Sequence, residues 1–229
     1  MKITSVICSL AILALCTSGC KKDIVNNLAP NTVTDIDGNV YKTVEIGTQT
    51  WMAENLKVTK YRNGDLIQYI TDSTAWGALT SGAYCWYNNA PDTYQATYGA
   101  LYNWFAVTDS RNIAPVGWHV PTDSEWITLT NFLGGETLAG GKLKEAGTIH
   151  WQSPNAGATN ETGFTALPGG HRTEYGPFGA TILNRGHWWT STPSNSSISY
   201  YRDMDYSDIL VTRNLYYLRA GFSLRCLKD

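Results

Sequence analysis

Hydrophobic and polar positions alternate over short stretches of the chain, and clusters of Gly, Asn, Asp and Pro separate these stretches. Residues 33–53 are predicted to form a meander, because the hairpin dipeptide Asp37-Gly38 divides two such stretches and Gly47 ends the second. Another hairpin is predicted around Asn63-Gly64. Further short strands are predicted at residues 84–87, 163–167, 187–191, 198–204, 208–213 and 222–227.

A helix is predicted from Thr122 onward, where apolar residues recur at spacings of three and four. Thr122 and Glu125 form a capping-box pattern, in which each side chain accepts a hydrogen bond from a backbone amide of the first turn. The apolar stripe consists of Trp126, Leu129 and Leu133. Gly134-Gly135 is expected to end the helix in a left-handed conformation.

A second helix is predicted at residues 98–107, because four aromatic or apolar residues in it would share one face. Asp72 is expected to cap a short helix, and a helical piece at residues 138–146 is weakened by two glycines. Residues 147–186 are rich in Gly, Asn, Thr and Pro, so we expect a long irregular loop region there. Two main helices among short, mostly antiparallel strands indicate an α+β fold.

The first 19 residues have the pattern of a bacterial lipoprotein signal peptide. Lys2 precedes an uncharged apolar run, and Thr-Ser-Gly-Cys follows at 17–20. The run is too short to span a bilayer, which requires about 20 residues. We expect cleavage before Cys20 and attachment of lipid to this residue, which would hold the protein in a membrane. An ordinary secretory signal, cut near Gly19, is the alternative.

The remaining chain is expected to contain a tether and one domain. Residues 20–32 comprise the lipidated Cys and a polar segment without periodicity, and residues 33–229 have the length of one ordinary domain. The formal net charge is −2, and there is no basic patch, so nucleic acid is not an expected partner. The expected location is the bacterial cell envelope, at the outer membrane, with Lys21-Lys22-Asp23 hinting at surface exposure.

Aromatic residues and cysteines change this picture in two ways. The chain has 9 Trp and 14 Tyr, most of which are expected to fill the core, while the others suit a binding surface. After cleavage, Cys85 and Cys226 are the only cysteines besides Cys20. They either form a disulfide in an oxidising compartment or are buried free thiols. A catalytic role is disfavoured because their surroundings have the pattern of strands.

Asp203, Asp205 and Asp208 are the candidate calcium-binding or ligand-binding side chains. Alternation places Asp203 and Asp205 on one face of a strand, with Asp208 beyond a turn, and such carboxylates bind calcium. A solvated edge is the favoured alternative, because charges there also block strand addition. The four histidines lack the spacing of a metal site, and His119 is interpreted as a hydrogen-bonded core residue.

Seven motifs, in this order, resemble the Fibrobacter succinogenes major paralogous domain family of lipoproteins and other surface proteins. Together they cover almost the whole of residues 33–229, which makes the resemblance specific. The motifs are Asp35-Ile-Asp-Gly-Asn-Val-Tyr, Ile46-Gly-Thr-Gln-Thr-Trp-Met-Ala-Glu-Asn-Leu, Tyr98-Gly-Ala-Leu-Tyr-Asn-Trp, Gly117-Trp-His-Val-Pro-Thr-Asp-Ser-Glu-Trp, Gly163-Phe-Thr-Ala-Leu-Pro-Gly-Gly, Trp188-Trp-Thr-Ser-Thr and Gly221-Phe-Ser-Leu-Arg-Cys. Many members carry Cys where this chain has Ala114, so a disulfide that uses this position is absent here.

The resemblance implies a fold similar to C-type lectin-like domains and, more distantly, to the formylglycine-generating enzymes. It implies a scaffold and no particular activity. C-type lectins bind sugar through calcium with Glu-Pro-Asn or Gln-Pro-Asp and a Trp-Asn-Asp strand. None of these occurs here, and the nearest sequence is Ala90-Pro-Asp.

These observations favour a binding module over an enzyme. We expect a cell-envelope lipoprotein whose lectin-like domain binds a glycan or a surface protein, with calcium as the one candidate cofactor. The loop at residues 155–185 is the expected site, because loops commonly carry recognition. Two alternatives stay open: an oxidase of the formylglycine-generating type that uses Cys85 and Cys226, and a structural subunit of a surface assembly.

Overall fold

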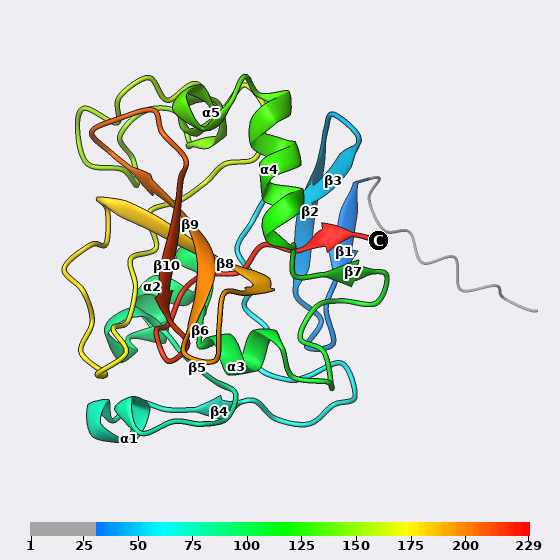
Figure 1. Ribbon diagram of the computed structural model, residues 1–229, viewed down its shortest axis with the longest axis vertical. Coiled ribbons are helices and arrows are strands. Elements are labelled where there is room, and N and C mark those ends of the chain that lie inside the picture. The colour runs from blue at the N-terminus through cyan, green and yellow to red at the C-terminus, as the bar shows by residue number, and fades with distance from the viewer. Residues whose placement is uncertain (1–30) are drawn as a thin grey trace, which may run out of the picture.

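The computed structural model describes residues 31–229 of the chain (Figure 1). The expected signal peptide at residues 1–19, the lipid-bearing Cys20 and nearly all of the tether at residues 20–32 lie outside this range. Within it, no helix has the length and apolar character needed to cross a membrane.

The first sheet has five strands and joins the two ends of the described chain. Its strand order is β1-β2-β3-β11-β7, and all of its pairings are antiparallel. The bounds are Thr32–Thr34 for β1, Val40–Ile46 for β2, Gln49–Met52 for β3, Trp118–His119 for β7 and Leu227–Lys228 for β11. The predicted meander is therefore confirmed, with Gly38 and Gly47 at positive φ in its two turns.

The second sheet consists of three antiparallel strands in the order β10-β9-β8. These strands are β8 (Arg185–Pro193), β9 (Ile198–Asp205) and β10 (Thr212–Tyr217). The predicted strands at residues 187–191 and 198–204 are confirmed. The strand predicted at 208–213 begins later, because the amide of Leu210 donates to the Asp208 carboxylate and the amide of Val211 donates to the Glu136 carbonyl.

The helix predicted at residues 98–107 is wrong. Helix α2 (Pro91–Tyr98) ends where this helix should begin, and β6 (Leu101–Tyr102) and α3 (Trp104–Val107) follow. Gly99 has φ of 73° and packs so closely on the backbone that a Cβ there would lie 2.7 Å from the Leu56 carbonyl oxygen. Asn103 then caps α3 by accepting the Ala106 amide.

A third small sheet contains the only parallel pairing among the named strands of residues 31–229. Strand β5 (Ala83–Cys85) pairs parallel with β4 (Gln68–Tyr69) and antiparallel with β6. Between β4 and β5 lies α1 (Ser73–Gly77), which Asp72 caps as predicted by accepting the Ala75 amide. The one-turn η1 (Tyr87–Asn89) precedes α2.

Helix α4 (Asp123–Phe132) has the predicted capping box, with both the Thr122 and the Glu125 side chains bonded to backbone amides. It lies between the first two sheets (Figure 1). Trp126 joins these layers, because its ring lies 4.9 Å from that of Trp51 on β3 and 6.5 Å from that of Trp188 on β8. Helix α5 (Glu136–Leu143) follows after Gly134 and Gly135, both at positive φ.

The strand predicted at residues 163–167 does not form. Thr165 has φ of 54°, which interrupts an extended backbone, and a single bridge between Lys144 and Ala166 is present. The carbonyls of Phe164 and Thr165 instead accept hydrogen bonds from Arg225, which is fully buried. A cation from a distant segment thus determines the local backbone.

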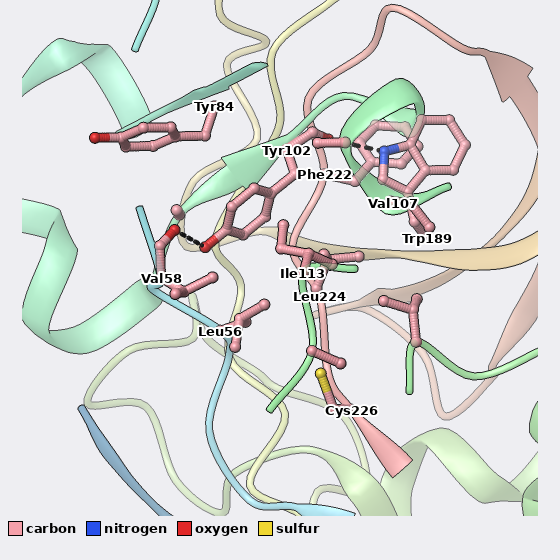
Figure 2. Packing of buried hydrophobic residues seen from close by; sticks show 14 of the residues in the cluster. Leu56, Val58, Tyr84, Tyr102, Val107, Ile113, Trp189, Phe222, Leu224 and Cys226 are labelled. Carbon is pink, nitrogen blue, oxygen red and sulfur yellow. Dashed lines mark hydrogen bonds between the residues drawn. The ribbon is translucent and has the colours of Figure 1, made fainter. Parts of the chain in front are cut away.

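Aromatic side chains fill the core, as the composition predicts. In the cluster that Figure 2 shows, the Tyr102 hydroxyl donates to the Val58 carbonyl at 2.7 Å. The Trp189 indole donates to the Tyr102 carbonyl at 2.9 Å. Each ring is therefore buried with its polar atom satisfied, which keeps the burial of Tyr and Trp favourable. Helices and mostly antiparallel sheets around this core confirm an α+β fold.

Candidate functional site

The richest group of ionisable and aromatic side chains lies on one face of the β8-β9-β10 sheet. The strand register aligns His187 of β8 with Asp203 of β9, and Asp203 with Thr212 of β10. The next row on this face aligns Trp189, Tyr201 and Asn214. The loop that precedes β8 contributes His171, whose ring centroid lies 4.8 Å from that of His187.

Both histidines of this face are neutral at pH 7. Burial, with a smaller contribution from the positive charge of Arg185, lowers the pKa of His171 to about 4. Burial also lowers the pKa of His187 well below its ordinary value, and the neighbouring His171 lowers it further. The Nδ1 atom of His171 is paired with the Thr181 hydroxyl at 2.9 Å. These rings are therefore packing and hydrogen-bonding groups, and they are weak bases.

The carboxylates of Asp203 and Asp205 lie on the same face of β9, as strand alternation predicts. Both already interact with side chains of this protein. The Arg185 guanidinium lies 2.6 Å from Asp205 and 3.5 Å from Asp203. The Thr212 hydroxyl donates to Asp203 at 2.6 Å. Burial raises the pKa of Asp203, which further disfavours a second negative charge beside Asp205.

The carboxylate of Asp208 accepts a hydrogen bond from the Leu210 amide, and a lysine supplies the cation beside this segment. The fully buried Lys144 donates to the carbonyls of Ala156, Asp205 and Asp208 at 3.1, 2.9 and 2.6 Å. Its three ammonium donors are thereby satisfied by three oxygens. Burial lowers the pKa of Lys144 to about 8. Among residues 31–229, no group of three or more His, Cys, Asp or Glu side chains is arranged to hold a metal ion.

Glu174 and Tyr216 interact at the end of the same face. The carboxylate of Glu174 is buried, and one of its oxygens, Oε2, has no hydrogen-bond partner in the described chain. Burial, and then the contact with Glu174, raises the pKa of Tyr216 to about 12. Tyr175 beside it is 72% exposed. An exposed aromatic ring therefore lies beside a buried carboxylate here.

A groove of about 230 Å³ lies around the end of β10. Figure 1 shows α3 beside this end of the sheet. Its lining residues come from α3, the β8–β9 turn and the end of β10: Phe105, Ser196, Ser197, Tyr217, Leu218 and Arg219. Tyr217 is half exposed, and its ring lies 6.1 Å from that of Tyr216. The groove and the polar face therefore meet at this pair of tyrosines.

Cys85 and Cys226 are free thiols and lie in different hydrophobic clusters. This is the second of the two states that the sequence left open. Burial raises the pKa of Cys85 to about 12 and also raises the pKa of Cys226. Both thiols are therefore mainly protonated at neutral pH, and they lie in separate clusters.

His119 is hydrogen-bonded, as interpreted from the sequence, but a third of its side chain reaches solvent. Its ring nitrogens lie 2.7 Å from Asp229 and 3.0 Å from Glu125. The imidazole thus links the C-terminal strand to the capping box of α4. This arrangement accounts for the residue without a metal ion.

Only part of the candidate site was predictable. The loop predicted at residues 155–185 contributes His171, Glu174 and Tyr175, but Arg219 and Tyr217 come from the other side of the sheet. The Tyr216-Tyr217 pair could have predicted the exposed tyrosine, because two successive side chains of a strand point to opposite faces and one of them must face outward. The buried hydrogen bonds of Lys144 could not be predicted from the sequence, because the partners of this residue lie between 12 and 64 residues away.

Comparison with known proteins identifies the family of the domain. No curated protein and no solved structure matches it. The model of the Fibrobacter succinogenes major domain matches residues 44–228, which include every strand and helix of the site. The chain therefore belongs to the Fibrobacter succinogenes major domain family.

Proposed function

We propose that this protein is a cell-envelope lipoprotein whose lectin-like domain binds a glycan of the envelope or of another surface. Lipid on Cys20 would anchor it to the outer membrane, and residues 20–32 would hold the domain away from the bilayer. About a dozen extended residues reach roughly 40 Å. The domain would then be exposed on the cell surface.

The groove at the end of β10 is the observation that carries the proposal. It combines a half-exposed Tyr217 and a partly exposed Phe105 with the hydroxyls of Ser196 and Ser197. Binding sites join aromatic surface with a few polar groups that fix orientation. At about 230 Å³ the groove is smaller than a typical ligand pocket of about 300–1,000 Å³. It therefore suits one residue of a longer chain.

A glycan array tests this function directly. The purified full-length protein, kept in detergent, is applied to the array with calcium and with a chelator. Binding to a defined set of glycans that is lost in Tyr217→Ala is the expected result. Tyr69→Ala, which removes an exposed tyrosine of β4 outside the groove and the polar face, is the matched control. Absence of binding to any glycan or cell-wall fraction would contradict the glycan proposal.

The two alternative functions have different support. An oxidase of the formylglycine-generating type needs reactive thiols, and both Cys85 and Cys226 are buried apart with raised pKa values. We therefore propose a binding protein and no enzyme. A structural role in a surface assembly predicts self-association, so a monomeric native mass of the purified protein would count against it.

A further inference from the structure

We infer that the groove at the end of β10 recognises an anionic sugar residue through Arg219, without calcium. This inference rests on the proposed function and adds the class of glycan. The anionic group is a carboxylate or a sulfate on the sugar, since both present oxygens to a guanidinium in the same way.

Arg219 differs from every other arginine of residues 31–229. The other seven guanidinium groups donate to carbonyl or carboxylate oxygens: Arg62, Arg111, Arg172, Arg185, Arg202, Arg213 and Arg225. The Nε atoms of Arg202 and Arg219 are both buried without a partner, but Arg202 donates to Asp123 through its terminal nitrogens, whereas Arg219 makes no side-chain hydrogen bond or ion pair within residues 31–229. The terminal nitrogens of Arg219 are not among the buried atoms, and the residue lines the groove, so they can donate to an acceptor supplied from outside the chain.

The walls of the groove select a sugar over a bare anion. Tyr217 and Phe105 offer apolar ring surface, and Ser196 and Ser197 offer hydroxyls that both donate and accept. A sugar ring has an apolar C–H face and a rim of hydroxyls, which matches this combination. A guanidinium binds a carboxylate or sulfate with two parallel hydrogen bonds, which also fixes the orientation of the ring.

Calcium has no role in this recognition, because the chain already supplies the cations near its acidic residues. Arg185 is paired with the carboxylates of Asp203 and Asp205, and the charge of Lys144 interacts with those of Asp205 and Asp208. These carboxylates thus have cations within the chain, whereas Arg219 lies beyond the end of β10 and lines the groove.

The experiment measures binding of full-length protein in detergent to three matched oligosaccharides: an oligogalacturonide, the neutral galactose oligomer and a sulfated galactose oligomer. We expect the galacturonide or the sulfated sugar to bind at least tenfold more tightly than the neutral one, with no change on addition of EDTA. Arg219→Gln should remove this preference by lowering binding of the acidic sugars to about that of the neutral one. The Lys228→Gln variant loses the same charge from an exposed site outside the groove, and it should behave as wild type.

The outcomes separate this inference from the proposed function. Equal binding of acidic and neutral sugars, loss of binding in EDTA, or an Arg219→Gln variant that keeps the preference would overturn the inference alone. Failure to bind any of the three oligosaccharides would overturn the inference, whereas the proposed function is contradicted only when the glycan array is negative as well. Preference for the sulfated over the carboxylated sugar, or the reverse, supports the inference and identifies the anion. Circular dichroism confirms that each variant is folded.

Discussion

The ammonium of Lys144 lies 2.6 Å from the carbonyl oxygen of Asp208, although 64 residues separate the two along the chain. The same nitrogen reaches the carbonyls of Asp205 and Ala156. It therefore joins the end of α5, the start of the long loop and the turn between β9 and β10. One buried cation thus holds together three segments that are distant in the sequence.

Replacing Lys144 by Met should lower the free energy of unfolding by about 3–5 kcal/mol, because three buried carbonyls lose their donor. Urea unfolding followed by tryptophan fluorescence measures this change. Lys142→Met is the control, since Lys142 makes a largely exposed ion pair with Glu161 and should change stability by less than about 1 kcal/mol. Equal effects of the two substitutions would show that the Lys144 contacts contribute little.

Sequence predicts this fold best where a structure is determined by neighbouring residues. The Asp37-Gly38 turn and the Thr122–Glu125 capping box each depend on fewer than five residues, and both are present. The helix predicted at residues 98–107 fails because the close approach of Gly99 to Leu56 is a contact between distant segments. The same limit applies to Arg225, whose hydrogen bonds to Phe164 and Thr165 replace an expected strand.

The candidate site follows the same rule. Alternation correctly places Asp203 and Asp205 together, because the period of a strand is a local property. Their compensation by Arg185 depends on strand pairing, which the pattern does not specify. Arg219 lacks a partner because no acceptor in the described part of the chain lies near its guanidinium. This depends on the position of every other residue, so the sequence could not predict it.

Acidification should destabilise the protein between pH 6.5 and 5. The pKa of His171 is about 4 in the folded state and about 6.5 in the unfolded chain, so the unfolded state binds more protons in this window. Stability is therefore present above the unfolded pKa and decreases as pH falls, by up to about 1.4 kcal/mol per pH unit for each such imidazole. His187 acts in the same direction.

Urea unfolding at pH 7, 6 and 5 measures this dependence. His171→Gln should reduce the slope by up to one proton, because the glutamine does not titrate and the half-buried site tolerates an amide. An unchanged slope in this variant would show that His171 is protonated equally in both states. The window stays above pH 5 so that carboxylates with lowered pKa values, such as Asp123 and Asp109, contribute little. Burial raises the pKa of Asp203, which acts in the opposite direction, and the comparison of His171→Gln with the wild type cancels this contribution.

The thiols of Cys85 and Cys226 should not react in the native protein. Both are fully buried, and burial raises the pKa of each, so the nucleophilic thiolate is scarce at pH 8. A charged alkylating reagent should label neither residue in the folded state and both in urea, as judged by mass spectrometry of the peptides. Rapid labelling in the native state would support the oxidase alternative, and protection in urea without reductant would indicate a disulfide.

Gly140→Ala should destabilise the protein although alanine favours a helix over glycine by about 1 kcal/mol. A Cβ at this position would collide with the carbonyl group of Leu210, because α5 packs directly on the segment before β10. The backbone must separate, which weakens the Lys144 contacts on the same side, so we expect a loss of about 2–4 kcal/mol. Leu138→Ala, on the exposed side of the same helix, should change stability by less than about 1 kcal/mol. An increase in the urea midpoint of Gly140→Ala would contradict this prediction. It would show that the gain in helix propensity exceeds the cost of the clash with Leu210.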